Sequence, residues 1–234
     1  MEEKLQHITS LIRNIKSEKK QENITIVAVS KNVGINKIKE AYSLGIRNFG
    51  ESRAQELVEK IKLIDYKDIN WHFIGTLQKN KVKYVVPIAY LIHSVDSIEL
   101  LEEINKQANK NNKIQNCLIE FKTSYEDSKA GIENFDELKT ILNYAQELSN
   151  VKIIGLMTIS PLTEDVDVIR QSFRKLYDIK AELNNLGYAL TELSMGMSGD
   201  YGIAIEEGST IVRIGTYIFG ERDYTKSWRE TLYE

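Results

Sequence analysis

A lysine directly follows an apolar run near the start of the chain, and its amine is the first group in the sequence suited to chemistry. Ile24-Thr-Ile-Val-Ala-Val-Ser30 is mostly apolar or β-branched and leads into Lys31. Such a run is typical of a parallel strand covered on both faces, so we expect Lys31 at a loop mouth. A lysine that loses hydration there favours its free amine, which attacks carbonyl carbons to form a Schiff base. Because most lysines after strands are simply solvated, other residues must support this hypothesis.

Small and polar residues gather in the last part of the chain. Leu193-Ser-Met-Gly-Met-Ser-Gly199 allows close backbone approach, and Ser198 offers a hydroxyl. Residues 200–206 are expected to start a helix whose first amides favour an anion. Gly215 and Thr216 add amide and hydroxyl donors at the end of a later strand candidate. These groups together predict a phosphate site.

An arginine lies within that later strand candidate, Thr210-Ile-Val-Arg-Ile-Gly-Thr216. Strand alternation places Ile211, Arg213 and Gly215 on one face, with Val212 and Ile214 on the other. An enclosed guanidinium without an acceptor costs several kcal/mol, so Arg213 needs a partner inside the site. A salt bridge to a core carboxylate such as Glu120 is the purely structural alternative.

The order of elements predicts a barrel that would bring these groups together. Helical patterns separate eight strand candidates, and an amphipathic helix over residues 2–20 precedes them. The strand candidates are residues 24–30, 46–50, 71–75, 90–95, 116–122, 151–157, 190–194 and 210–215. The helical patterns include 36–44, 53–64, 97–108, 135–148, 166–186 and 201–206. Eight strands fit a closed (β/α)8 barrel of the TIM type, whereas open doubly wound sheets commonly need about five or six. With two prolines and no linker-like stretch, we expect one domain over residues 1–234.

Composition and charge exclude several classes of function. The chain has 234 residues and a net charge of −3, which gives no field suited to a nucleic-acid backbone. The sequence shows neither a signal-peptide layout nor an apolar run long enough to span a bilayer. Three histidines and one cysteine, Cys117, show no close metal-ligand spacing, and Cys117 is interpreted as a core residue. We therefore expect a cytoplasmic protein without a metal site.

Taken together, the candidate groups match the needs of pyridoxal 5′-phosphate (PLP). The cofactor's aldehyde would react with Lys31, and its phosphate would be held by Ser198 with Gly215 and Thr216. Its ring nitrogen would face Arg213. The combination is much more specific than any one of these residues, because in a barrel the carboxyl ends of all eight strands meet at one mouth.

The sequence also closely resembles the family of pyridoxal phosphate homeostasis proteins, which share the barrel of fold-type III enzymes such as the alanine racemase N-terminal domain. The resemblance spans nearly the whole chain and is carried by Ala28-Val-Ser-Lys31, Phe49-Gly-Glu51, Trp71-His-Phe-Ile-Gly75, Leu77-Gln78, Asn80-Lys81, Ser128-Lys-Ala-Gly131, Gly155-Leu-Met157, Leu193-Ser-Met-Gly-Met-Ser198, Gly208-Ser-Thr-Ile-Val-Arg-Ile-Gly-Thr216 and Ile218-Phe-Gly220. It implies that Lys31 forms an internal aldimine with PLP. It also supports the expected phosphate and ring-nitrogen contacts. One departure is Ser52, where relatives usually carry asparagine, so the side-chain amide of that asparagine is absent here.

Two further residues have two interpretations each. Met157 is a candidate cofactor contact, although a methionine at a strand end is more often part of the core. His72 could face the pocket or be a hydrogen-bonded core histidine, and the second interpretation is preferred because no base partner is visible in the sequence.

Two kinds of function fit a PLP barrel. The preferred one is a non-catalytic carrier, without catalytic residues, that holds PLP and hands it to apoenzymes or to PLP-synthesising enzymes; we expect a monomer. The alternative is a PLP-dependent amino-acid racemase of fold-type III, which needs acid/base groups on both faces of its substrate. A third possibility is a lysine-dependent aldolase without PLP. An arginine opposite the ring nitrogen weakens the electron sink and makes transamination unfavourable.

Overall fold

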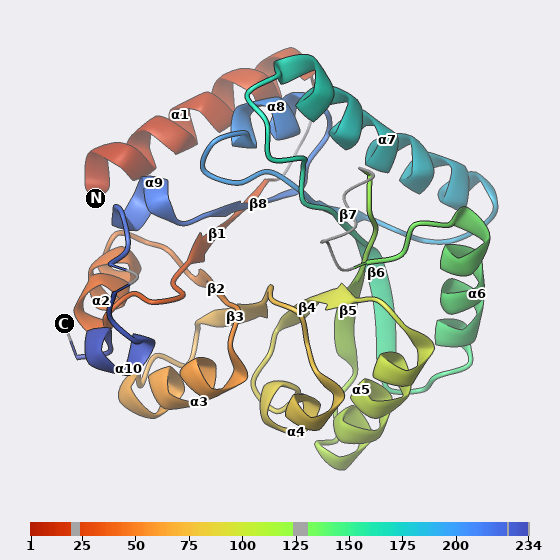
Figure 1. Cartoon of the computed structure of the whole chain (residues 1–234), viewed down its shortest axis with the longest axis horizontal. Helices are drawn as coiled ribbons and strands as arrows, with labels where there is room; N and C mark the ends of the chain where they lie inside the picture. Colours follow the sequence, from red (N-terminus) through yellow and green to blue (C-terminus); the bar gives the residue numbers. More distant parts are fainter. Residues whose placement is uncertain (20–23, 124–130, 224, 234) are drawn as a thin grey trace.

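Eight parallel strands close into a barrel in sequence order within the described part of the chain (Figure 1). The computed structural model describes residues 1–19, 24–123, 131–223 and 225–233, with the backbone alone for residues 11–19. The strands are β1 (Thr25–Val29), β2 (Asn48–Glu51), β3 (Asn70–Phe73), β4 (Leu91–Val95), β5 (Gln115–Glu120), β6 (Val151–Met157), β7 (Glu192–Ser194) and β8 (Ile211–Ile214). Each overlaps one strand candidate, so the predicted (β/α)8 fold class is confirmed.

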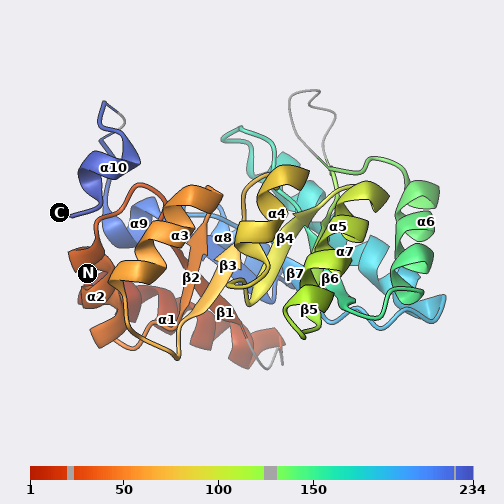
Figure 2. The same cartoon turned by 90° about the horizontal axis from the view of Figure 1, so that it is seen from below.

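Helices form an outer ring around the strands. They are α1 (Glu2–Lys19), α2 (Ile35–Ser43), α3 (Ala54–Leu63), η1 (Lys79–Lys81), α4 (Val82–Val85), α5 (Ile98–Lys110), α6 (Phe135–Gln146), α7 (Val166–Asn185), α8 (Tyr201–Glu206), α9 (Thr216–Phe219) and α10 (Trp228–Thr231). The extra N-terminal helix α1 packs against α8 and α9. Figure 2 shows both chain ends on the same side of the molecule. The expected helix over residues 2–20 is described as far as residue 19, and residue 20 lies outside the described residues.

Four short helices among the described residues had no counterpart among the predicted helical patterns. η1 and α4 lie between β3 and β4, α9 follows β8 directly, and α10 follows α9. Helices of three or four residues complete about one turn, which is too short for a 3.6-residue period to show. For α9 this changes a prediction, because β8 ends at Ile214 and Thr216 begins a helix.

Strand alternation divides the apolar side chains between two layers. A small cluster inside the barrel contains Val27, Leu91, Leu118, Met157 and Ile211. The larger core lies between the strands and the helices and includes their strand neighbours, such as Val212 and Ile214. The predicted two faces of β8 are therefore confirmed. Inward positions nearer the carboxyl ends of the strands are left for polar residues.

No helix among the described residues is both long and apolar enough to cross a membrane.

Candidate functional site

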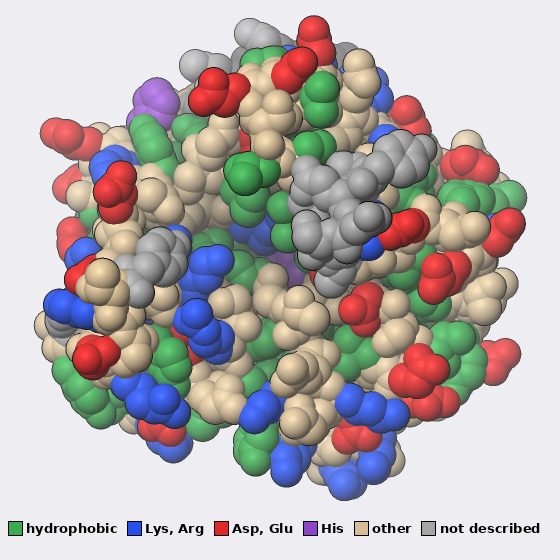
Figure 3. Space-filling model, in the orientation of Figure 1, with side chains coloured by type: hydrophobic (Ala, Val, Ile, Leu, Met, Phe, Trp, Pro, Cys, Tyr) green, Lys and Arg blue, Asp and Glu red, His purple; other side chains and the backbone are tan. Residues whose placement is uncertain are grey.

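Lys31 lies in a tight turn after β1, at the carboxyl end of the barrel. The backbone N–H of Val33 donates to the carbonyl of Ser30 at 3.0 Å, which closes the turn around a half-buried Lys31. β1 and β8 are parallel neighbours, with Ala28 beside Ile214. The segments that follow β1 and β8 therefore leave the sheet at the same end of the barrel, which we call the mouth. The face shown in Figure 3 is hollowed near its centre, and basic side chains lie beside the hollow.

The predicted phosphate-binding residues come together after β7 and β8. The Oγ of Ser198 accepts the backbone N–H groups of Gly215 and Tyr217, each at 3.2 Å. Thr216 is exposed, and its Oγ1 accepts from Nη1 of Arg222 at 3.5 Å. Two hydroxyls and two amides thus form one group of hydrogen-bond donors, which suits the acceptor oxygens of a phosphate.

Arg222 explains why residue 215 is a glycine and links this group to β1. Its Nη2 donates to the carbonyl of Val29 at 2.8 Å. A Cβ at Gly215 would lie 2.3 Å from that Nη2 atom and 3.3 Å from the Cβ of Val29. The missing side chain therefore lets the guanidinium pass between β8 and the end of β1. This holds the Gly215 segment close to the Lys31 turn.

The helix predicted after β7 is present as α8, which begins at Tyr201 with Asp200 as its N-cap residue. The binding of an anion by its first amides stays a prediction, and the carboxylate of Asp200 makes no capping hydrogen bond to the helix. That carboxylate accepts the N–H of Met197 and the hydroxyl of Ser160, each at 2.5 Å. A negative side chain there disfavours a second anion. The amides that meet Ser198 belong instead to Gly215 and Tyr217.

Arg213 lies deeper in the barrel and is held by neutral acceptors. Its side chain points to the inner face, and the residue is 5% exposed. Nη1 donates to the backbone oxygen and Oγ of Ser194 at 2.8 and 2.6 Å, and Nη2 donates to the carbonyl of Thr158 at 2.8 Å. Among the described residues no ion pair joins it to Glu120, so the alternative salt bridge is wrong. Burial lowers the pKa of Arg213 to about 10, and Glu120 and Asp200 oppose that shift.

A chain of buried hydrogen bonds leads from Arg213 across the barrel interior. Oγ of Ser194 lies 2.9 Å from Nδ1 of His93, and Nε2 of His93 lies 2.9 Å from Nδ1 of His72. Nε2 of His72 then lies 3.1 Å from Oδ1 of Asn48. His72 is thus a hydrogen-bonded core histidine, as preferred from the sequence. Its partner is a second histidine on the next strand.

The direction of this chain follows from its two ends. Because Arg213 can only donate, Oγ of Ser194 accepts there, and its own proton goes to Nδ1 of His93. Nε2–H of His93 then donates to Nδ1 of His72, and Nε2–H of His72 donates to the side-chain oxygen Oδ1 of Asn48. Both imidazoles are neutral in this arrangement. Burial lowers the pKa of His72 to about 3 and that of His93 well below its usual value.

Met157 and Glu120 face the interior from neighbouring strands. They are register partners on β6 and β5, and Met157 is 1% exposed within the inner apolar cluster. Glu120 lies two residues beyond Leu118, which shares that cluster, so its side chain also points inward. Burial raises the pKa of Glu120 to about 7, while the charge of Arg213 opposes the shift. An ionisable carboxyl therefore stands near Met157.

Several interior residues were not identified from the sequence. His93, Ser194 and Arg222 carry central hydrogen bonds. Strand alternation could have placed His93 inside, because Leu91 on the same strand faces inward. Ser52, the departure from the family pattern, lies against Gly75, where a Cβ would be 2.4 Å from its carbonyl oxygen. The motif residues Ser128 to Ala130 lie outside the described residues.

The residues present fit PLP. An amine for the aldehyde lies after β1, and four donors for the phosphate lie after β7 and β8. Arg213 lies on β8, two residues before Gly215. Cavities of about 210 Å³ flank the mouth on two sides. One is lined by Asn32, Lys37 and Arg222, and the other by Ser52, Arg53 and Lys81.

Comparisons with known proteins agree with this fold. The family model of the alanine racemase N-terminal domain matches residues 4–223. A pyridoxal phosphate homeostasis protein of Aquifex aeolicus (strain VF5) is 48% identical over 200 residues, covering 85% of this chain and 87% of that protein. The Homo sapiens pyridoxal phosphate homeostasis protein is 37% identical over 213 residues, covering 86% and 78%. PipY of Synechococcus elongatus PCC7942, solved with PLP bound, is 35% identical with a TM-score of 0.78, covering 90% of this chain and 100% of that one.

The closed parallel barrel and its carboxyl-end site define a protein of the class represented by the alanine racemase N-terminal domain. Within that class, the chain belongs to the family of pyridoxal phosphate homeostasis proteins, because the relatives of that name match most of its length. The family resemblance expected from the sequence is thereby confirmed.

Proposed function

We propose that this protein binds PLP through an imine with Lys31 and takes part in the homeostasis of that cofactor. Its relatives are named for pyridoxal phosphate homeostasis, and the PipY structure contains PLP. The observation that carries the proposal is the meeting of two kinds of group at one mouth. An amine follows β1, and the donors around Ser198 follow β7 and β8. An aldehyde and a phosphate on one flat ring require such a pair.

Each interior residue has a proposed part in holding the cofactor. Ser198, Gly215 and Thr216 hold the phosphate, since their hydroxyls and amides are all donors. Arg213 faces the ring nitrogen, and Met157 packs against the ring from β6. When bound, PLP supplies a reactive aldehyde and an electron-accepting ring. What the chain supplies is position and electrostatics.

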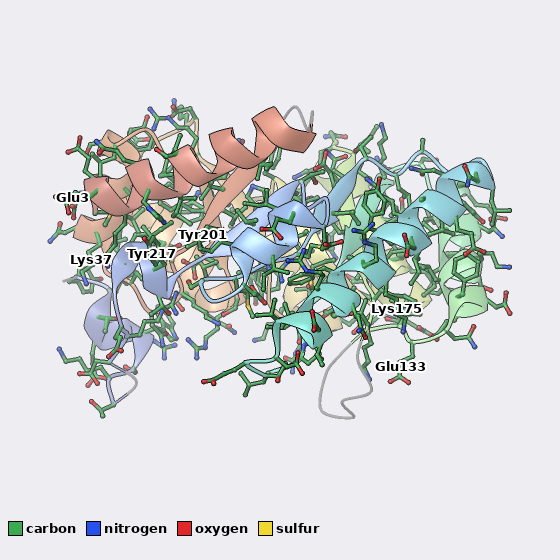
Figure 4. All side chains as sticks on the ribbon, turned by 90° about the horizontal axis from the view of Figure 1, so that it is seen from above. Glu3, Lys37, Glu133, Lys175, Tyr201 and Tyr217 are labelled. Carbon is green, nitrogen blue, oxygen red and sulfur yellow. The ribbon has the colours of Figure 1, made fainter. Side chains whose placement is uncertain are left out.

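We propose that the protein is a carrier and not an enzyme. With a pKa of about 10, Arg213 remains charged at neutral pH, so it disfavours a proton on the facing ring nitrogen. The tyrosine nearest the phosphate donors, Tyr217, turns its ring toward α1. There it lies 6.1 Å from the rings of both Tyr201 and His7 (Figure 4). It is therefore poorly placed to serve as the second acid/base group of a racemase.

Borohydride reduction followed by mass spectrometry tests the attachment. Purified protein mixed with PLP and reduced should carry one pyridoxyl group, on Lys31. Lys31→Ala should lose the imine absorbance. Lys37→Ala is the matched control, because Lys37 lines the neighbouring cavity and should not affect the absorbance. A pyridoxyl group on another lysine would contradict the proposed site.

A second measurement separates the carrier from the racemase. The loaded protein should transfer PLP to an apoenzyme and should not sustain turnover of amino-acid enantiomers. Continued racemisation by the purified protein would refute the carrier assignment. The aldolase alternative predicts a colourless protein that processes carbonyl substrates without bound PLP.

A further inference from the structure

The turn that carries Lys31 is held in an uncommon backbone conformation. Asn32 has a φ of 54°, in the left-handed region that few residues other than glycine and asparagine adopt readily. Ser30, on the other side of Lys31, is fully buried, and its N–H donates to the carbonyl of Gly50 at 2.9 Å. Both neighbours of Lys31 are therefore fixed. The contacts that fix them come mostly from one group of charged side chains.

That group consists of Lys60 on α3, Glu51 at the end of β2 and Glu56 on α3, all three side chains being 0% exposed. Nζ of Lys60 donates to the carbonyl of Ser30 at 2.6 Å and to Oε1 of each glutamate at 2.7 Å, which uses its three protons. Oε1 of Glu51 also accepts the hydroxyl of Ser30, and Oε1 of Glu56 accepts the N–H of Asn32, each at 2.6 Å. One buried ammonium thus connects to both residues that flank Lys31.

Stability alone does not account for this cluster. Two carboxylates and one ammonium without solvent contact carry a large desolvation cost, and burial raises the pKa of Glu51 although Lys60 opposes the shift. Well-packed apolar residues in place of buried ion pairs are often equally stable or more so. The feature that apolar residues could not reproduce is the set of hydrogen bonds to the turn. The geometry therefore points to a role in placing Lys31.

We propose that Lys60, with Glu51 and Glu56, acts as a positioning group that fixes the turn of Lys31 for reaction with a carbonyl compound. This inference rests on the proposed function, since it concerns the same amine. The three side chains have no exposed surface and come from β2 and α3, so they lie behind the mouth and do not line it. Its effect passes through Ser30 and Asn32.

Two variants test the proposal without leaving a buried charge uncompensated. Glu56→Met removes the link to Asn32 and leaves Lys60 paired with Glu51. The triple variant Glu51→Leu, Glu56→Leu, Lys60→Met replaces the whole cluster by apolar side chains. Unfolding curves establish that each variant is folded. Lys60→Met alone is expected to unfold more easily, because it leaves the buried carboxylate of Glu51 without its cation, while Glu56 keeps only an ion pair with Arg53 at 3.5 Å.

The readout is the reactivity of Lys31 in the ligand-free protein. Brief treatment with formaldehyde and borohydride, followed by mass spectrometry, gives the labelling rate of Lys31 relative to Lys106. Lys106 lies on α5, away from the turn, with a side chain 61% exposed. We expect the ratio to fall by about tenfold or more in the folded variants, because a released turn lets the half-buried amine of Lys31 hydrate, and hydration favours the unreactive ammonium. A wild-type ratio in either folded variant overturns the positioning role.

The same variants separate this inference from the proposed function. If wild-type protein traps PLP on Lys31 and a folded variant traps it equally fast, the positioning role fails and the PLP site stands. If wild-type protein does not trap PLP on Lys31, the proposed function fails whatever the labelling ratio.

Discussion

Replacing Ser194 by alanine is expected to break the hydrogen-bond chain between Arg213 and the two histidines. The residue is fully buried, and the substitution removes one oxygen atom. Its Oγ accepts from Nη1 of Arg213 at 2.6 Å and donates to Nδ1 of His93 at 2.9 Å. Losing a charge-assisted hydrogen bond costs about 1.5–3 kcal/mol, and an unsatisfied buried acceptor costs about 1–3 kcal/mol. Because Arg213 keeps two carbonyl partners, we expect a total of about 2–4 kcal/mol.

Urea unfolding of the ligand-free protein measures this loss of free energy. For a chain of this size, it corresponds to a fall in Tm of about 4–16 °C. Ser172→Ala is the matched control, since Ser172 is also buried but its hydroxyl meets only the neutral hydroxyl of Thr123 at 2.5 Å. The control should cost less. If Ser194→Ala is no more destabilising than Ser172→Ala, the chain does not hold Arg213 as described.

Three other predictions follow from buried positions. The folded-state pKa of His72 is about 3 and that of His93 is also depressed, both by burial. The unfolded chain therefore binds more protons than the folded protein below pH 6.5. The free energy of unfolding should fall by about 2 kcal/mol per histidine between pH 6.5 and 5 in acid-unfolding titrations. Nitrogen NMR should show both as neutral Nε2–H tautomers, and a charged form at pH 6 would contradict the assigned direction. Gly155→Ala should prevent normal pairing of β6 with β7 and yield mostly unfolded protein by circular dichroism, because its Cβ would lie 2.0 Å from the carbonyl oxygen of Glu192. Cys117, fully buried and with its pKa raised by burial, should resist thiol reagents in the native protein and react after denaturation; fast native labelling would show that β5 opens.

The sequence by itself determined the barrel and the position of Lys31 after its first strand. Buried parallel strands give apolar runs, and their number and spacing were sufficient to predict a closed (β/α)8 fold. The alternation of residues along the strand correctly predicted the two faces of β8, with Ile211 facing the interior and Val212 facing the helices. The position of Lys31 after the first strand followed in the same way, because the exit of a strand depends on nearby residues.

Only the tertiary structure decided which polar groups meet. His93 and Ser194 are 101 residues apart, and Arg213 meets Ser194 in place of Glu120. The tilt and stagger of all the strands decide which inward-facing residues meet across a barrel. The local periodicity of the sequence contains no information about tilt or stagger. The same reason hid the contacts of Asp200, because its carboxylate meets Ser160, which lies 40 residues earlier in the chain.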